Sequence, residues 1–136
     1  MSLLTDNEKA KAVRGYARKT NGTERWHLPA GKNLIYTDGI KFLADTCGAY
    51  WLIDLVGSYQ PQLRNEHFQV WRLRPYGNNG IIVDCWSDIP ERQADEDGPA
   101  SIKFCEQIIE YSDFPRELLP FEFWVQHDTM LLKEEY

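Results

Sequence analysis

The chain has 136 residues, a formal net charge of −6 and a hydrophobic content of 43%. A chain of this size is most simply one domain, and it can bury a core without disulfides or metals. Its acidity argues against nucleic acid as a partner, because non-specific binding to phosphates needs a basic surface. No stretch approaches the roughly 18 apolar residues of a membrane-spanning helix, so we expect a soluble protein with no membrane partner.

The three cysteines, Cys47, Cys85 and Cys105, are widely spaced and form no C-x-x-C pair. An odd number cannot all pair within one chain, and stable disulfides are rare in the cytosol. The beginning of the chain lacks the apolar segment of a secretory signal. We therefore expect reduced, mostly buried thiols and a cytoplasmic location.

The first predicted element is a helix over residues 6–19. Thr5 followed three residues later by Glu8 is typical of a capping box, in which each residue's side chain bonds the other's backbone N–H. Residues 1–20 carry more basic than acidic side chains, and the apolar stripe of the helix is thin. The pattern predicts a basic helix that docks loosely onto a single domain spanning residues 1–136.

Two short runs rich in β-forming residues come next and predict a strand at 34–36 and a weaker one at 24–28. Thr37 or Asp38 then suits the N-cap of a second helix, which Gly48 ends or kinks. A third helix, or a bent continuation of the second, follows directly.

Asp54 lies within the most apolar run of the chain, CGAYWLIDLVGSYQ. The helical period places it on one stripe with Tyr50 and Ser58, opposite a wide apolar face. Strand alternation does not fit the same residues. We therefore predict a central packing helix that carries Asp54 on its polar side.

The second half of the chain has the pattern of strands. Two β-rich runs, 67–75 and 81–87, are joined by YGNNG, and Asn79 and Gly80 both tolerate the positive φ of a tight turn. These residues predict a β-hairpin. A polar loop over 89–100 follows it.

A further strand is predicted over 101–112, with a bulge near Glu106. A second hairpin, from 121 to 132, turns at His127 and Asp128. Helices followed by strands predict an α+β domain, in which N-terminal helices pack on one face of an antiparallel β-meander of about four to five strands.

Several segments resemble a family of small proteins catalogued as a domain of unknown function and found in bacteria and on plasmids and phages. The segments are NGTERW, LIYTDGIKFLADTCGAYWLIDLVGSYQ, FQVWRL, DFP and the ending MLLKEEY. The resemblance spans about residues 20–136, and the block YTDGIKFLADTCGAYWLIDLV is its most specific part. It carries over no activity and no catalytic residue. It implies a setting of accessory genes, often on mobile elements.

Four residues form the candidate small-molecule site: Tyr36, Asp38, Tyr50 and Asp54. The carboxylates lie on neighbouring helical segments, and the phenols could donate hydrogen bonds beside them. A partly buried carboxylate of this kind can serve as a general base. The structural alternative is that Asp38 caps a helix and Asp54 is solvated or fixes two elements.

Four acidic residues define a candidate interaction loop: Glu91, Asp95, Glu96 and Asp97. Such a loop could imitate phosphates and occupy a basic groove on another protein. The structural alternative is a solvated loop.

Other chemistry has weaker support in the sequence. His27, His67 and His127 stand far apart without a metal-ligand spacing, so we predict no metal and no cofactor. Cys47 within an apolar helix is more typical of core packing than of a nucleophile.

Three functional hypotheses follow. The first is a non-enzymatic module that binds another protein, for example a phage-borne inhibitor of a bacterial defence system. The second is a small-molecule binder or small enzyme that uses the Tyr/Asp pocket. The third is self-association into a homo-oligomer through the Trp-rich sheet.

Overall fold

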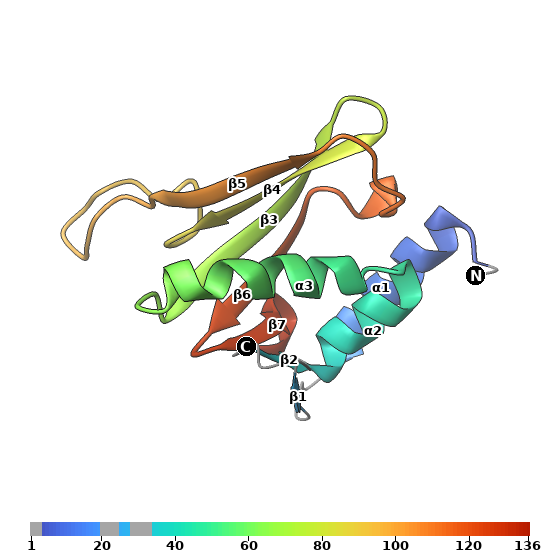
Figure 1. Cartoon of the computed structure of the whole chain (residues 1–136), viewed down its shortest axis with the longest axis horizontal. Coiled ribbons are helices and arrows are strands. Elements are labelled where there is room, and N and C mark those ends of the chain that lie inside the picture. Colours follow the sequence, from blue (N-terminus) through green and yellow to red (C-terminus); the bar gives the residue numbers. More distant parts are fainter. Residues whose placement is uncertain (1–3, 20–24, 28–33) are drawn as a thin grey trace.

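The computed structural model describes residues 4–19, 25–27 and 34–136, and these residues form helices packed against one sheet (Figure 1). The helices are α1 (Asp6–Lys19), α2 (Asp38–Cys47) and α3 (Tyr50–Tyr59), with short 3-10 turns η1 (Gln60–Leu63), η2 (Arg116–Leu118) and η3 (Lys133–Glu135). The strands are β1 (Arg25–His27), β2 (Ile35–Thr37), β3 (Phe68–Tyr76), β4 (Gly80–Trp86), β5 (Lys103–Ile109), β6 (Phe121–Gln126) and β7 (Thr129–Leu132). The α+β class is therefore confirmed.

The strands run across the sheet in the order β1-β2-β7-β6-β3-β4-β5. Most neighbours are antiparallel, but β2 pairs with β7 in parallel. The predicted meander of four to five strands is therefore wrong in two respects. The short N-terminal strands join the sheet beside β7, and β6 crosses over from β5 to pair with β3. Sequence patterns indicate which residues are extended, but they do not indicate which strand becomes the neighbour.

Helix α2 is defined at both ends by the residues the sequence indicated. Thr37 is its N-cap, and the Thr37 hydroxyl oxygen accepts a hydrogen bond from the Ile40 N–H at 3.4 Å. Gly48 ends the helix with a left-handed φ of 62°, and its N–H donates to the Ala44 carbonyl. Since left-handed φ costs glycine little, the chain turns here and begins α3 two residues later.

Helix α3 buries Leu52, Ile53 and Val56, while Tyr50, Asp54 and Ser58 are exposed. The predicted polar side of this helix is confirmed. The other side of the helix is apolar, and directly after the helix Gln60 of η1 meets Gln69 of β3. Gln60 and Gln69 exchange two side-chain hydrogen bonds of 3.0 and 2.9 Å.

The N-terminal helix α1 docks through a short apolar stripe. Ala10 and Val13 are buried, and the Tyr16 ring stacks on Phe42 of α2 with ring centroids 4.5 Å apart. The predicted capping box is present, because Thr5 and Glu8 exchange two hydrogen bonds of 3.1 Å.

Both predicted hairpins form, with one correction to the first turn. Tyr76 pairs with Gly80, and the residue with positive φ in the turn between them is Gly77, at 59°. Gly80 instead begins β4 in a crowded place, where a side-chain carbon would lie 2.6 Å from the Ile109 carbonyl oxygen. The second turn is as predicted, since His127 and Asp128 both have positive φ.

The C-terminal turn η3 ties the end of the chain to the beginning of α2. The Glu135 carboxylate accepts hydrogen bonds from the Thr37 hydroxyl at 2.7 Å, the Gly39 N–H at 3.2 Å and the Leu132 N–H at 2.9 Å. A negative charge at a helix N-terminus is favourable because the first N–H groups of a helix have no partner within it. Two of the segments that carried the family resemblance, the long segment that begins LIYTDGI and the ending MLLKEEY, thus bond to each other.

Candidate functional site

The two sides of the sheet carry different chemistry. On one side, residues such as Trp71, Phe123 and Met130 are completely buried in a cluster with residues of α2 and α3, and these helices lie across the sheet in Figure 1. The alternate residues point the other way, because successive side chains in a strand leave opposite faces. We call this second side the open face, made by Val70, Arg72, Arg74, Ile82, Asp84, Trp86, Glu106, Ile108, Glu122 and Trp124.

A row of charged residues crosses the open face. Glu122, Arg72, Asp84 and Glu106 are directly opposite one another on β6, β3, β4 and β5. Asp84 is only 1% exposed, and its carboxylate accepts hydrogen bonds from Arg74 Nη2 at 2.8 Å and from an indole N–H at 3.0 Å. A buried carboxylate is costly unless it is paired, and here the pairing comes from side chains on the same face.

An aromatic row lies beside the charged row. Trp124 and Trp86 sit on β6 and β4 with Val70 of β3 between them. The Trp124 ring makes edge-on contacts with Phe68 and Tyr136, with ring centroids 5.3 and 5.1 Å apart. The open face therefore offers aromatic surface next to fixed charges, which is the composition of a recognition surface.

A groove begins where β6 enters the sheet. It consists of two hollows of about 310 and 190 Å³, and Pro120, Phe121, Glu122 and Lys133 line both. The larger hollow is completed by Val13, Arg14, Ala17, Leu118, Leu119 and Glu134. The smaller hollow is completed by Arg72 and Glu91. We call this depression the groove.

Arg72 connects the groove to the open face. Its Nη2 donates to Glu91 at 2.8 Å, and this hydrogen bond lowers the pKa of the Glu91 carboxyl. Its Nε–H is buried without a hydrogen-bond partner. A buried donor without an acceptor is costly, so an acceptor placed in the smaller hollow would be stabilised there.

The groove therefore combines an apolar floor with charges of both signs. Its floor includes Leu118, Leu119 and Phe121, and its cations are Arg14, Arg72 and Lys133. Arg14 already donates to the Glu117 carbonyl. Such a lining can hold an extended peptide, since it offers apolar contact to side chains and charged partners to carboxylates or carbonyls.

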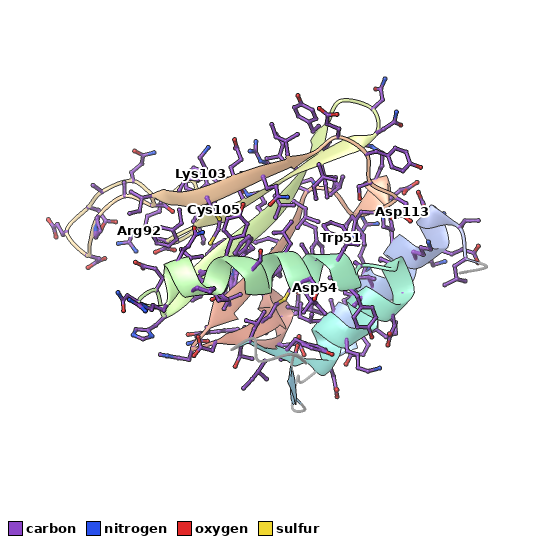
Figure 2. The ribbon with its side chains drawn as sticks, in the orientation of Figure 1. Trp51, Asp54, Arg92, Lys103, Cys105 and Asp113 are labelled. Carbon is purple, nitrogen blue, oxygen red and sulfur yellow. The ribbon has the colours of Figure 1, made fainter. Side chains whose placement is uncertain are left out.

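The four residues of the predicted Tyr/Asp site lie on three elements, Tyr36 on β2, Asp38 on α2, and Tyr50 and Asp54 on α3. Tyr36 is 9% exposed and belongs to the core cluster, Asp38 is the first residue of α2, and Tyr50 is exposed. Asp54 lies on the exposed side of α3 (Figure 2).

Tyr50 bonds to the carboxylate of Asp45, which was not among the residues predicted from the sequence. The Tyr50 hydroxyl donates to Asp45, and Lys41 pairs with the same carboxylate at 2.9 Å. The hydrogen bond to Asp45 raises the pKa of Tyr50 to about 12 and lowers the pKa of Asp45. The spacing of Lys41 and Asp45, four residues apart in a helix, was the available signal.

The predicted acidic loop is divided in the structure. Glu91 forms an ion pair with Arg72 of β3, whereas Asp95, Glu96 and Asp97 are exposed to solvent. Arg92, shown on the loop in Figure 2, bonds Asp88 at 3.0 Å and Asp95 at 3.3 Å. The loop therefore has an internal cation that neutralises part of its charge.

The remaining candidates from the sequence, for a nucleophile or a metal site, are Cys47 and the histidines. Burial raises the pKa of the Cys47 thiol to about 12, which suits a core residue. The rings of His67 and His127 lie 5.4 Å apart, although both residues stood alone in the sequence; His27 has no described side chain. The described residues contain no group of three or more potential metal ligands. No helix among them is long and apolar enough to cross a membrane.

Comparisons with known proteins identify a family without an activity. The family model described as a family of unknown function (DUF6876) matches residues 13–136. No curated protein and no solved structure matches the chain significantly. The match covers every residue of the open face and the groove.

Proposed function

We propose that this chain, which belongs to DUF6876, a family of unknown function, acts by binding another protein through the groove. The observation that carries the proposal is the lining of the groove, where apolar residues and charges of both signs lie side by side. The function is then recognition and not catalysis.

The charges of the open face support this reading. Arg74 is held by Asp84, and Arg72 by Glu91, in contacts of 2.8 Å. Charges that are paired in this way present a fixed electrostatic pattern to a partner.

The partner fitted by the groove is an extended protein segment. One apolar side chain of this segment would lie against Phe121 and Leu119. A neighbouring carboxylate would approach Lys133, which is exposed at the junction of the two hollows, and a carbonyl would accept from Arg72 Nε. Contacts of this kind fix the register of a peptide more than they add affinity.

Site-specific photocrosslinking tests the proposal. A photoreactive benzophenone amino acid replaces Lys133 in the organism that carries the gene, and adducts are identified by mass spectrometry. The matched control replaces Lys11, an exposed lysine on α1 outside the groove. We expect a discrete protein adduct at position 133 and none at position 11.

Charge reversal gives the quantitative arm of the test. With the captured partner purified, Lys133→Glu should weaken binding about tenfold, whereas Lys11→Glu should leave it unchanged. Absence of an adduct at position 133, or equal effects of the two reversals, would rule the groove out.

The accessory setting implied by the resemblance makes the proposal more specific. In a cytoplasmic protein encoded on a phage or plasmid, the groove would engage a host protein, such as a component of a bacterial defence system. Co-purification of a defence component with the wild-type protein, and its loss with Lys133→Glu, is the expected result.

A further inference from the structure

Two of the three cysteines face each other across neighbouring strands. Cys85 of β4 and Cys105 of β5 are directly opposite in the antiparallel register, and their thiols are hydrogen-bonded. Residues directly opposite in such a pair have Cα atoms about 4.5 or 5.5 Å apart. A disulfide requires roughly 4.4–6.8 Å. The backbone of the two strands therefore already has the spacing that a disulfide needs.

The two thiols differ in exposure and in acidity. Cys85 is completely buried, and burial raises the pKa of its thiol. Cys105 is half-buried on the edge strand β5, and the hydrogen bond from Cys85 lowers the pKa of its thiol. Because the thiolate is the reactive form, Cys105 is the nucleophile of the pair. Figure 2 labels Cys105 on β5, which is the edge strand of the sheet and lies above α3 in this view.

We infer that Cys85 and Cys105 form a reversible, redox-active dithiol pair that low-molecular-weight disulfides such as glutathione disulfide oxidise. The geometry carries this inference, since the paired strands place the two sulfur atoms together in the folded chain. It does not depend on the binding function of the groove. A transient disulfide of this kind is compatible with a reducing cytosol.

The oxidation proceeds by two thiol–disulfide exchanges. The Cys105 thiolate attacks one sulfur of glutathione disulfide, forms a mixed disulfide and releases one glutathione thiolate. Cys85 then attacks the Cys105 sulfur and releases the second glutathione, which takes the Cys85 proton. The two protein thiols lose two electrons in total, and one glutathione disulfide becomes two glutathione thiols.

The disulfide would close the base of the loop between β4 and β5. This loop leaves the sheet immediately after the pair, at Trp86, and returns at Lys103, where the strand register shifts. It carries Glu91, which bonds Arg72 on β3. Oxidation would therefore fix the loop covalently at the point where its strands are least regular.

Redox titration of the whole chain tests the inference. The folded protein is equilibrated in buffers of glutathione and glutathione disulfide and quenched with acid. It is then unfolded in denaturant, so that the buried thiols become accessible, alkylated and analysed by mass spectrometry. We expect a species that has lost two hydrogens and takes up one alkyl group, on Cys47, with a peptide linking positions 85 and 105. Reducing agent should restore three alkylation sites.

Variants separate this pair from other thiol chemistry. Cys105→Ser should abolish the intramolecular disulfide, and Cys85→Ala should trap one glutathione on Cys105. Cys47→Ala should still form the disulfide between positions 85 and 105, because Cys47 lies in α2, away from the pair. Circular dichroism confirms that each variant is folded. Three free thiols in the most oxidising buffer, or a disulfide that appears only in urea, would overturn the inference.

Discussion

The two faces of the sheet show how the same strands meet different physical demands. On the helix-facing side, Trp71 and Phe123 stack with ring centroids 6.2 Å apart and are completely buried. On the open face, the directly adjacent Arg72 and Glu122 are charged and only partly buried. The first face is specified by volume and shape, whereas the second is specified by pairing of charges.

The contrast between the two faces indicates where a functional surface can arise. Residues under α3 cannot change without repacking the core, because the interior is close-packed. Exposed residues of the open face, such as Glu106, can change their charge while the fold is kept. A binding specificity is therefore more readily placed on the open face and in the groove than beneath the helices.

The largest expected effect is on the helix-facing side. Phe123→Ala should lower the free energy of unfolding by about 3–5 kcal/mol, because it removes a buried aromatic ring and leaves a cavity. The control is Trp124→Ala on the next residue of β6, which is only partly buried. Urea denaturation measures both variants. An equal loss for the two would show that the open face is packed like a core, and the comparison would fail.

The next effect tests charge pairing on the open face. Arg74→Met should lower the free energy of unfolding by about 2–3 kcal/mol, since it leaves the buried Asp84 carboxylate without its cation. Asp84→Asn should cost less, about 1 kcal/mol, because the amide oxygen still accepts a hydrogen bond and Arg74 is 40% exposed.

A double-mutant cycle completes this test. Arg74→Met combined with Asp84→Asn should cost less than the sum of the single variants, because the two residues act as a pair. The order of the two single effects is the decisive observation. If Asp84→Asn is the more destabilising change, the carboxylate contributes through contacts other than Arg74.

A third change breaks the link between the C-terminal turn and the helices. Gly39→Ala places a methyl group where the Glu135 carboxylate lies, and a side chain as flexible as Glu135 can move away only by losing its bonds to Thr37 and Gly39. We expect a loss of about 1–3 kcal/mol in thermal or urea unfolding. In a Glu135→Ala background the same change should cost much less.

Gly15 provides the matched control for this glycine. Nothing lies within 4 Å of a methyl group added there, in the interior of α1. Gly15→Ala should therefore stabilise the protein by about 0.5–1 kcal/mol through helix propensity. If Gly39→Ala proves equally stabilising, the carboxylate does not hold the beginning of α2.

These regions also show what the sequence could predict. The helix periods, the caps at Thr37 and Gly48, and the exposed position of Asp54 follow from local patterns, so they were predictable. The pairing of β2 with β7 was not, because strand partners depend on the whole chain.

The groove could not be predicted from the sequence for the same reason. Arg14, Arg72 and Lys133 are far apart in the chain, and the crossover of β6 brings them to one depression. Glu91 illustrates the point on a smaller scale. The sequence grouped it with an acidic loop, but its charge is directed at Arg72 on the sheet.

The smallest expected effect concerns that contact, and it can be read from pH dependence. The hydrogen bond from Arg72 lowers the pKa of Glu91 below its ordinary value of 4.5. A lowered pKa in the folded state gives stability that is present above the unfolded value and is lost as the pH falls through the folded value. Glu91→Gln should therefore cost less than about 1 kcal/mol at neutral pH, since the pair is exposed.

The pH profile separates this pair from a general charge effect. The difference between wild type and Glu91→Gln should shrink as the pH falls below 4.5, and it should also shrink in high salt. Glu96→Gln, on the same loop and exposed, should show neither trend. A difference for Glu91→Gln that persists at pH values where the carboxyl is protonated would mean that the loop is held over the open face by contacts other than this charge pair.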